Sequence, residues 1–549
     1  MKVKAANGLV RILKEEGVEW VSTFPTCVFN NACGEEGVRN FMVRDERYAV
    51  AVADGFSRVS NGKSFGVCSM MGGLNAAGTQ MAYGAIAQAY EDSTPILCLT
   101  DGVPPGSSGV ERFNIEDAFS SVTKWSGYIN EPRRVPEFMR RALTQLRSGR
   151  PGPVLLQLPR GLGEYDEGEN RYTPVQGWRS QGDPRDVDMA ARAILSAKRP
   201  LIYAGQGVFY ADACEELLRF AELVNAPVLT TLKGKSCFPE DHRLSAGVRG
   251  APAEAMLKTA DVVFAIGCGL SPSTFGHRIP SPHEKKIIQC TVEESDINRL
   301  YNVGHAIIGD ARLVLRQLIE QVESDGPPGE RREQMEALEE ARREKREKYC
   351  PLLSSEETPI NPYRVYWELM QALERRNSFV THESGNTRDQ LSTVYEALVP
   401  HGFMGWGNVS TLGFGLGAVM GAKLAFPGRQ AVCVTGDAGV GYQMGNYEAL
   451  VRNGMGVTIV HINNSGFAGY GPGFWGHGHS PYTNKVTSSE VQSTARVAEG
   501  LGIHAERVEG PDEVAPALKR ALEVNASDRP AFIEVICCQY PVYGPWIRG

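Results

Sequence analysis

The stretch 431–467, AVCVTGDAGVGYQMGNYEALVRNGMGVTIVHINNSGF, constrains the fold of this chain more than any other. It begins with an apolar run that stops at Gly436-Asp437, continues with a helical pattern, and closes with a second apolar run that stops at Asn463-Asn464. Strand, helix and strand of this length form a βαβ unit, whose two strands are parallel. The polar residues are therefore expected at the carboxyl ends of two parallel strands, where open α/β sheets bind ligands.

The chemistry of Asp437 and Asn464 predicts a magnesium site. Carboxylate and amide oxygens are hard ligands suited to Mg²⁺, which keeps further positions for phosphate oxygens. Glycines at 436, 439 and 441 let backbone N–H groups approach an anion. Either dipeptide alone is typical of an ordinary strand-end turn. Both together, 27 residues apart and bracketing one βαβ unit, favour a phosphorylated cofactor.

This pair resembles the GDG…NN motif of the thiamine diphosphate (thiamine pyrophosphate) enzymes in the acetolactate synthase and 2-oxo acid decarboxylase superfamily. The resemblance implies that Asp437, Asn464 and the backbone carbonyl of Gly466 hold Mg²⁺. Ala438 stands where the motif has its second glycine, as in the GDA and GDS variants of relatives that use CoA thioesters. The cofactor contacts implied by this stretch are Gly436, Asp437, Ala438, Gly439, Asn464, Gly466 and Phe467.

A second motif is similar to the same superfamily. RDERYAVAVADGFSR resembles the family pattern RHEQGAAHMADGYAR, whose glutamate bonds N1′ of the thiamine aminopyrimidine, and this makes Glu46 the candidate catalytic acid/base. Position alone predicts an ordinary first-turn residue that complements the helix dipole. A carboxyl group walled in by apolar side chains has a raised pKa, which suits proton exchange with a ring nitrogen. The resemblance also implies that Glu46 reaches a cofactor held by a partner subunit, in a homodimer or homotetramer.

Two further stretches, HESGNTRDQ and GWGNVSTLGFGLGAVMGAKLA, resemble cofactor-binding segments of the family. The resemblance implies that Ser384, Gly385 and Asn386 approach the diphosphate. It also implies that the Ser410 carbonyl accepts the aminopyrimidine amino group and that Leu412 is the apolar wedge that bends the cofactor. Taken alone, the glycine-rich stretch predicts only the start of a helix rich in small residues.

Departures from the family pattern gather on the expected substrate side. STFPTCV stands where the family has GxPGxxV, Met70 and Met71 replace a Gly-Pro pair, and Ser120 replaces a glutamine. These changes alter bulk and hydrogen bonding, so we predict a poor acetolactate synthase that prefers another 2-oxo acid, acyl donor or acceptor aldehyde. The candidate substrate residues are Thr26, Cys27, Asn75, Phe119, Lys124 and Trp475.

His477 and His479 follow the βαβ unit in a loop rich in aromatic residues. An imidazole has an unperturbed pKa near 6.5, so both are candidate catalytic proton donors. The alternative is that both are solvated loop residues. The aromatic tail YPVYGPWIRG is interpreted either as a cover over the same opening or as ordinary packing.

The alternation of apolar runs and helical patterns predicts an α/β protein of three domains, each a parallel sheet flanked by helices. These are a pyrimidine-binding domain (1–165), a central doubly wound domain (186–325) and a diphosphate-binding domain (355–549), with a charged linker helix at 326–354. In the first domain we expect strands at 20–23, 39–43, 65–69 and 96–100, and helices from the N-terminus to about residue 16, at 46–59 and at 74–90.

The central domain gives a weak nucleotide signal. A GQG follows its first strand, but a lone GxG is not a dinucleotide fingerprint. GLSPSTFGHR and CTVEES replace the segments that FAD-dependent synthases carry, so FAD is doubtful.

Composition narrows the class of protein. A net charge of −7 argues against nucleic-acid and membrane partners. No apolar run approaches the ~20 residues of a membrane span, and the N-terminus does not resemble a signal peptide, so a cytoplasmic protein is expected. The twelve cysteines include no CxxC pair and are expected to be reduced.

The predicted reaction makes or breaks a C–C bond next to a carbonyl of a 2-oxo acid or acyl donor, as in acetolactate synthase-like carboligases and decarboxylases. One alternative is a 2-hydroxyacyl-CoA lyase or an enzyme like oxalyl-CoA decarboxylase. Another, from a different class, is a catalytically silent nucleotide-binding paralogue. Glu46 together with the Asp437 and Asn464 pair argues against the silent alternative.

Overall fold

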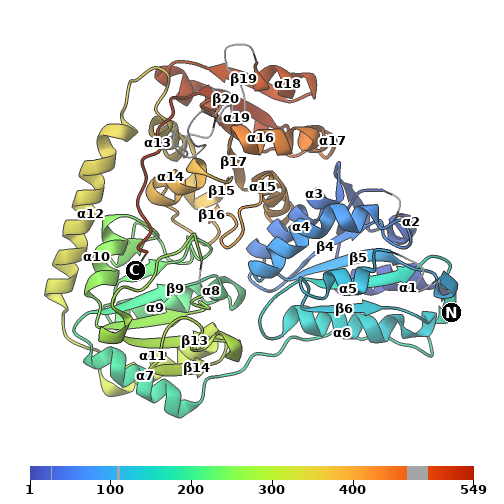
Figure 1. Ribbon diagram of the computed structural model, residues 1–549, viewed down its shortest axis with the longest axis horizontal. Helices are drawn as coiled ribbons and strands as arrows, with labels where there is room; N and C mark the ends of the chain where they lie inside the picture. Colours follow the sequence, from blue (N-terminus) through green and yellow to red (C-terminus); the bar gives the residue numbers. More distant parts are fainter. Residues whose placement is uncertain (26, 108–111, 272, 467–491, 549) are drawn as a thin grey trace. The chain divides into compact units, whose positions relative to one another are not determined.

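The computed structural model describes residues 1–25, 27–107, 112–271, 273–466 and 492–548 (Figure 1). The chain divides into two compact units. The first contains 1–178 and 420–427, and the second contains 179–419 and 428–549.

The first unit contains a six-stranded parallel sheet with the order β3-β2-β4-β5-β7-β6. Its central strands are buried along their whole length, because helices cover both faces of a parallel sheet. The strands are β2 (Trp20–Thr23), β3 (Arg39–Met42), β4 (Gly66–Met70), β5 (Ile96–Gly102), β6 (Trp125–Tyr128) and β7 (Val154–Pro159). The helices are α1 (Ala5–Glu15), α2 (Val28–Glu36), α3 (Glu46–Val59), α4 (Ala77–Glu91), α5 (Ile115–Phe119) and α6 (Val135–Arg147).

The helix predicted from the N-terminus begins later than expected. The first residues form β1 (Lys2–Lys4), which pairs antiparallel with β8 (Glu164–Asp166) and places Val3 opposite Tyr165. Ladder hydrogen bonds to a segment far along the chain therefore override the local helical pattern there.

The second unit begins with the central sheet, whose order is β11-β10-β9-β12-β13-β14. Its parallel pairing and the helices between its strands confirm the doubly wound pattern. The strands are β9 (Pro200–Ala204), β10 (Val228–Thr230), β11 (Ser245–Gly247), β12 (Val262–Ile266), β13 (Lys286–Thr291) and β14 (His305–Ile308). The main helices are α7 (Pro184–Ser196), α8 (Gly207–Tyr210), α9 (Cys214–Leu223), α10 (Ala251–Thr259) and α11 (Ala311–Asp325).

The third sheet carries the βαβ unit, in the order β16-β15-β17-β18-β20-β19. Strands β17 and β18 are adjacent and parallel, with Val432 opposite Thr458 and Gly436 opposite Ile462. The strands are β15 (Ser378–His382), β16 (Phe403–Met404), β17 (Gln430–Gly436), β18 (Thr458–Asn463), β19 (His504–Val508) and β20 (Ala531–Ile536). The helices are α13 (Pro362–Ala372), α14 (Asn386–Val394), α15 (Phe414–Ala425), α16 (Asp437–Gln443), α17 (Tyr447–Arg452), α18 (Thr494–Gly500) and α19 (Val514–Asn525).

The first and third sheets share one strand order. Numbered along the chain within each sheet, both run second, first, third, fourth, sixth, fifth, whereas the central sheet runs third, second, first, fourth, fifth, sixth. Each of the three sheets is parallel and flanked by helices, which confirms the predicted fold class.

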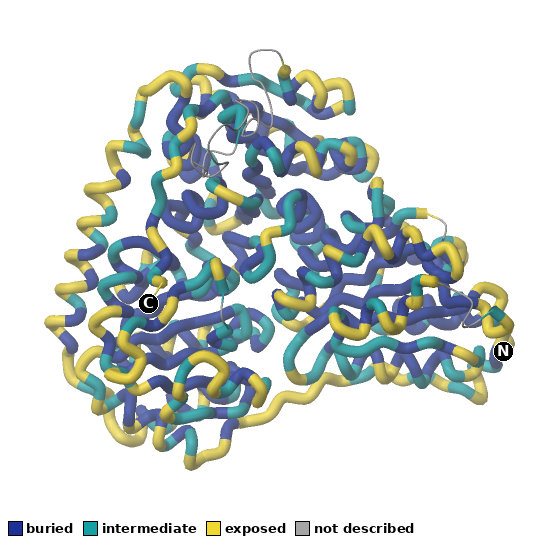
Figure 2. The backbone as a smooth tube through the Cα atoms, in the orientation of Figure 1, coloured by how far each residue is buried: buried dark blue, intermediate teal, exposed yellow. Residues whose placement is uncertain are grey.

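Helix α12 (Arg332–Leu353) connects the central and third sheets. Most of its length is exposed in Figure 2, and its surface carries ion pairs such as Arg346 to Glu339. One side, which includes Leu338 and Tyr349, is buried, so the helix packs as well as connects.

The C-terminal tail packs across two domains of the second unit. The Tyr363 hydroxyl donates to the Val542 carbonyl, and the Gly544 N–H donates to Thr393 Oγ1 at 3.1 Å. The Ile547 N–H donates to Nδ1 of His277, in the central domain, at 3.0 Å. The tail therefore ties the third domain to the central one.

The cysteines of the described residues form no disulfide, and Cys350 is the one that is exposed among them. None of the helices described above combines the length and the apolar character that crossing a membrane requires.

Candidate active site

The predicted metal ligands meet at the carboxyl edge of the third sheet. Asp437 follows β17 and Asn464 follows β18, and these strands are neighbours. The N–H groups of Asn464 and Gly466 both donate to Asp437 Oδ2, at 3.2 and 3.3 Å. The described residues contain no group of three or more His, Cys, Asp or Glu side chains that could hold a metal. A set of one carboxylate, one amide and one carbonyl has the hard oxygen character that Mg²⁺ requires.

A buried histidine supports the Asp437 carboxylate. His461 lies on β18, opposite Thr435, and places Nε2 at 3.3 Å from Asp437 Oδ1. Its Nδ1 is 2.9 Å from the Thr494 hydroxyl, at the start of α18. The ring therefore lies directly behind the carboxylate, the place from which outer partners commonly orient a metal ligand. The sequence analysis missed His461, because the residue that gives it a role, Asp437, follows the neighbouring strand.

The turn after β15 presents donors to an anion. Gly385 has a φ of 79°, and no atom of the described residues, apart from its chain neighbours, lies within 4 Å of the position where its Cβ would be. Asn386 starts α14, and its Nδ2 is buried without a hydrogen-bond acceptor among the described residues. The Ser384 hydroxyl bonds the Ser410 hydroxyl, which joins this turn to the glycine-rich loop. A helix N-terminus with an unused buried donor beside an open glycine fits a diphosphate.

The glycine-rich loop before α15 keeps its predicted cofactor residues accessible. Ser410 is exposed and Leu412 is half-buried. The loop is anchored to the interior of the domain, because the Gly413 N–H donates to Glu383 Oε2 at 2.8 Å. Glu383 is fully buried, and the sequence analysis missed it.

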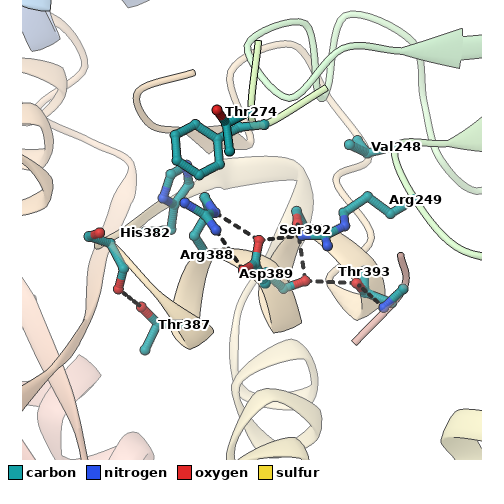
Figure 3. Close-up of polar contacts among 12 residues, drawn as sticks. Val248, Arg249, Thr274, His382, Thr387, Arg388, Asp389, Ser392 and Thr393 are labelled. Atoms are coloured by element: carbon teal, nitrogen blue, oxygen red, sulfur yellow. Dashed lines mark hydrogen bonds and ion pairs between the residues drawn. The ribbon is translucent and has the colours of Figure 1, made fainter. Parts of the chain in front are cut away.

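An ion-pair cluster links helix α14 to the central domain (Figure 3). Asp389 accepts from Nε and Nη2 of Arg388, at 2.8 and 2.6 Å, and also from Nη1 of Arg249, in the central domain. The Arg388 guanidinium lies 4.1 Å from the centre of the Phe275 ring. The cluster thus holds the helix that starts at Asn386 against the central domain.

In the first unit, Glu46 lies where an acid/base residue is expected. It is the first residue of α3, and Asp45 caps this helix by accepting from the Tyr48 N–H at 2.9 Å. The Glu46 side chain is buried against Gly78, where a Cβ atom would lie 2.4 Å from Glu46 Oε1. Burial raises the pKa of Glu46, and the charge of Asp45 adds to the shift.

The described candidate substrate residues lie in different surroundings. Cys27 is in the core of the first unit, and burial raises the pKa of its thiol far above the usual range, which excludes a thiolate at neutral pH. Phe119 is buried with its ring centre 5.2 Å from that of Tyr83, and Lys124 Nζ donates to the Gln145 carbonyl at 2.6 Å. Asn75 is exposed. Their substrate roles stay predictions.

Five candidate residues lie outside the described residues: Thr26, Phe467, Trp475, His477 and His479. The roles predicted for them stay predictions.

Comparison with known proteins matches all three domains. The family models that match are the thiamine pyrophosphate enzyme N-terminal TPP binding domain (residues 3–122), central domain (187–318) and C-terminal TPP binding domain (383–535). A probable acetolactate synthase large subunit of Methanocaldococcus jannaschii is 30% identical, over 97% of this chain and 92% of the relative. The glyoxylate carboligase of Escherichia coli O157:H7 is 30% identical, over 97% and 93%. Acetolactate synthase isozyme 3 large subunit of Escherichia coli K12 is 26% identical, over 100% and 97%.

Proposed function

The chain belongs to the thiamine pyrophosphate enzymes, and on that premise we propose that it is a Mg²⁺-dependent carboligase that joins a 2-oxo acid donor to a carbonyl acceptor. Membership makes it an enzyme that uses thiamine diphosphate to form or cleave C–C bonds. The observation that carries the magnesium proposal is the meeting of Asp437, Asn464 and Gly466 at two neighbouring strand ends.

Each group of residues has a separate task in this proposal. When bound, thiamine diphosphate supplies the carbon nucleophile and accepts the electron pair of the broken bond. The oxygens of Asp437, Asn464 and Gly466 would hold Mg²⁺, and the unused amide of Asn386 would donate to a diphosphate oxygen. The buried Glu46 carboxyl would exchange a proton with the aminopyrimidine ring, because its raised pKa keeps it protonated at higher pH than an exposed glutamate.

The proposed donor is a 2-oxo acid other than pyruvate. Met70 ends β4 fully buried and Met71 is half-buried, so the position of the family's Gly-Pro pair is filled with larger side chains. One relative is a glyoxylate carboligase by name, and glyoxylate is the smallest 2-oxo acid. A donor pocket narrowed by two methionines favours such a small donor.

A CoA-thioester lyase or decarboxylase is the second candidate. Ala438, the second residue of α16, is the feature that favours it, since the GDA variant occurs among relatives that use CoA thioesters. The catalytically silent alternative is not carried forward, because the family is one of enzymes.

A homodimer or homotetramer completes the proposal. In the first unit, Leu74 and Met81 of the α4 region are 56% and 55% exposed, and Tyr90 is 41% exposed. Large exposed apolar side chains on one element favour a protein partner, and a second copy is the partner that the family resemblance implies. Free cysteines suit the reducing cytoplasm.

Product analysis with different donors tests this function. The purified enzyme with thiamine diphosphate and Mg²⁺ would be offered pyruvate, glyoxylate, longer 2-oxo acids and a 2-hydroxyacyl-CoA, alongside the variants His477→Ala and His479→Ala. We expect a higher kcat/KM with glyoxylate than with pyruvate, and a loss of about 10²-fold or more in one histidine variant. Efficient acetolactate formation from pyruvate, unchanged in both variants, contradicts the proposal. Turnover of the thioester alone supports the second candidate.

A further inference from the structure

Glu383 lies where three cofactor-binding segments meet in the second unit. It follows β15 directly, and its side chain is fully buried. It precedes the turn 384–386, which faces the predicted diphosphate position. The other two segments are the loop 410–412 and helix α16, which begins at the predicted metal ligand Asp437.

The carboxyl group bonds all three segments. Its Oε2 accepts from the Gly413 N–H at 2.8 Å and from Gln443 Nε2 at 2.8 Å, at the end of the loop and of α16. Its Oε1 accepts from the Ser384 N–H at 3.3 Å, in the turn. One oxygen thus carries both short bonds, and the second carries the long one.

The packing around Glu383 leaves no space for a larger neighbour. A Cβ atom at Gly439 would lie 2.4 Å from Glu383 Cγ. A glycine on α16 is therefore what lets the carboxyl group reach beneath the helix. Position 439 also belongs to the predicted cofactor motif, so one glycine serves the cofactor on one side and Glu383 on the other.

The groups that face the carboxyl are neutral donors and acids. Besides the donors named above, the Gly415 N–H stabilises its charged form, while Cys433 and Tyr447 are coupled to it electrostatically. The pKa values of both neighbours are raised by burial, so both are neutral at pH 7. Burial without a cationic contact among these groups raises the pKa of Glu383 to about 7.

We propose that Glu383 is a positioning residue that sets the spacing of the turn 384–386, the loop 410–412 and helix α16. The proposal rests on the proposed function, since it concerns affinity for thiamine diphosphate.

Three substitutions test the positioning role. Glu383→Gln keeps an oxygen that can accept both short bonds, so its Kd for the cofactor should stay within about threefold of the parent value. Glu383→Leu removes the oxygen that accepts both short bonds, from the Gly413 N–H and the Gln443 amide, and should raise Kd by about 10- to 1,000-fold. Gln443→Leu removes one of the two short bonds and should give an intermediate Kd.

Titration calorimetry provides the test. Thiamine diphosphate is titrated into each variant at saturating Mg²⁺ and pH 7.5, which gives Kd. A Kd that Glu383→Gln keeps and Glu383→Leu loses shows that the hydrogen bonds, and not the bulk of the side chain, hold the three segments. Exposed Glu523→Gln is the matched control and should behave like the parent.

The outcomes are distinct. A Kd close to the parent value in both leucine variants overturns the proposal, and Gln443→Leu decides it alone if Glu383→Leu does not fold. Absence of cofactor binding by the parent is the separate failure of the proposed function.

Discussion

The first and third sheets of this protein share one strand order but carry opposite kinds of chemistry at their carboxyl edges. After its third strand, the first sheet has the apolar Met71, whereas the third sheet has Asp437. After its second strand, the first sheet has a short turn, 43–45, and then Glu46, whereas the third has the glycine-rich segment 405–413. A fold therefore fixes where a site can form, and a few residues at strand ends decide what it binds.

The electrostatics of the two edges differ in the same way. Asp437 accepts from two backbone N–H groups, and its Oδ1 lies 3.3 Å from His461 Nε2. Glu46 is buried against Gly78, and burial raises its pKa. The third sheet thus surrounds its predicted metal ligand with hydrogen-bond donors, while the first sheet buries its carboxyl group away from water.

Asp437→Ala should disrupt only the site at the carboxyl edge of the third sheet, and it should have the largest effect. Without this carboxylate we expect no measurable binding of thiamine diphosphate at millimolar Mg²⁺, because the metal that bridges to the diphosphate is lost. Calorimetry measures this, and EDTA should do the same to the parent. Exposed Asp512→Ala is the control and should bind normally. Unchanged affinity in Asp437→Ala contradicts the metal assignment.

Glu46→Gln should abolish proton exchange at the edge of the first sheet and leave cofactor binding at the third sheet intact. The amide keeps the size of the side chain but cannot exchange a proton, so turnover should fall by ~10²–10⁴-fold while cofactor affinity changes by less than a few-fold. Hydrogen exchange at C2 of the bound cofactor, followed by NMR, gives the direct readout. A normal exchange rate would remove Glu46 from the mechanism.

Glu383 is a buried carboxyl group in the third sheet, as Glu46 is in the first. Its substitution has the third-largest expected effect, on the free energy of unfolding. A carboxyl group with a pKa of about 7 when folded, against an ordinary 4.5, stabilises the fold fully below pH 4.5, and this stabilisation is lost as pH rises through 7. The difference corresponds to about 3 kcal/mol of unfolding free energy. Glu383→Gln should lose this dependence.

Hydrogen exchange of β15 amides in the cofactor-free protein, at pH 5 and pH 7.5, measures this difference for the parent and the variant. Relative to Glu383→Gln, the parent should be less stable at pH 7.5 than at pH 5. A parallel pH dependence in both proteins would show that the Glu383 carboxyl does not titrate in this interval.

Substitutions of Asp45 have the smallest expected effect and test the electrostatics at the edge of the first sheet. Asp45→Ala removes the cap of α3 and should cost about 1 kcal/mol of stability, whereas Asp45→Asn keeps a capping oxygen and should cost little. Because the charge of Asp45 raises the pKa of Glu46, Asp45→Asn should move the limb of the pH–rate profile that reports Glu46 to lower pH. An unmoved limb would assign that limb to another group.

Periodicity predicted most of the fold, and tertiary contacts account for the differences. Helix α3 has the predicted bounds, 46–59, and the strands of the βαβ unit lie next to each other as expected. The helix expected from 74 begins at Ala77, because Ala76 has a positive φ of 36°. The single helix expected after Asp437 is α16, a 3-10 turn and α17, since the period of apolar residues does not separate these forms.

The cofactor motifs predicted residues that the structure brings together, but not the residues behind them. Asp437 and Asn464 carry a recognisable spacing, whereas Glu383 and His461 gain their importance only from neighbours far away in sequence, Gly413 and Asp437. No local pattern reports which strand lies beside another. Buried polar groups that hold a site therefore require the three-dimensional arrangement.

The C-terminal tail has a consequence for the order of events during synthesis. His277 bonds the Ile547 N–H across 270 residues, and Arg249 stacks 4.2 Å from the Trp546 ring. A ribosome that adds 5–20 residues per second needs roughly 15 to 55 seconds to cover that distance. Until the tail is synthesised, the central domain lacks these contacts. The surface that binds Trp546 is then exposed to other nascent chains and to chaperones.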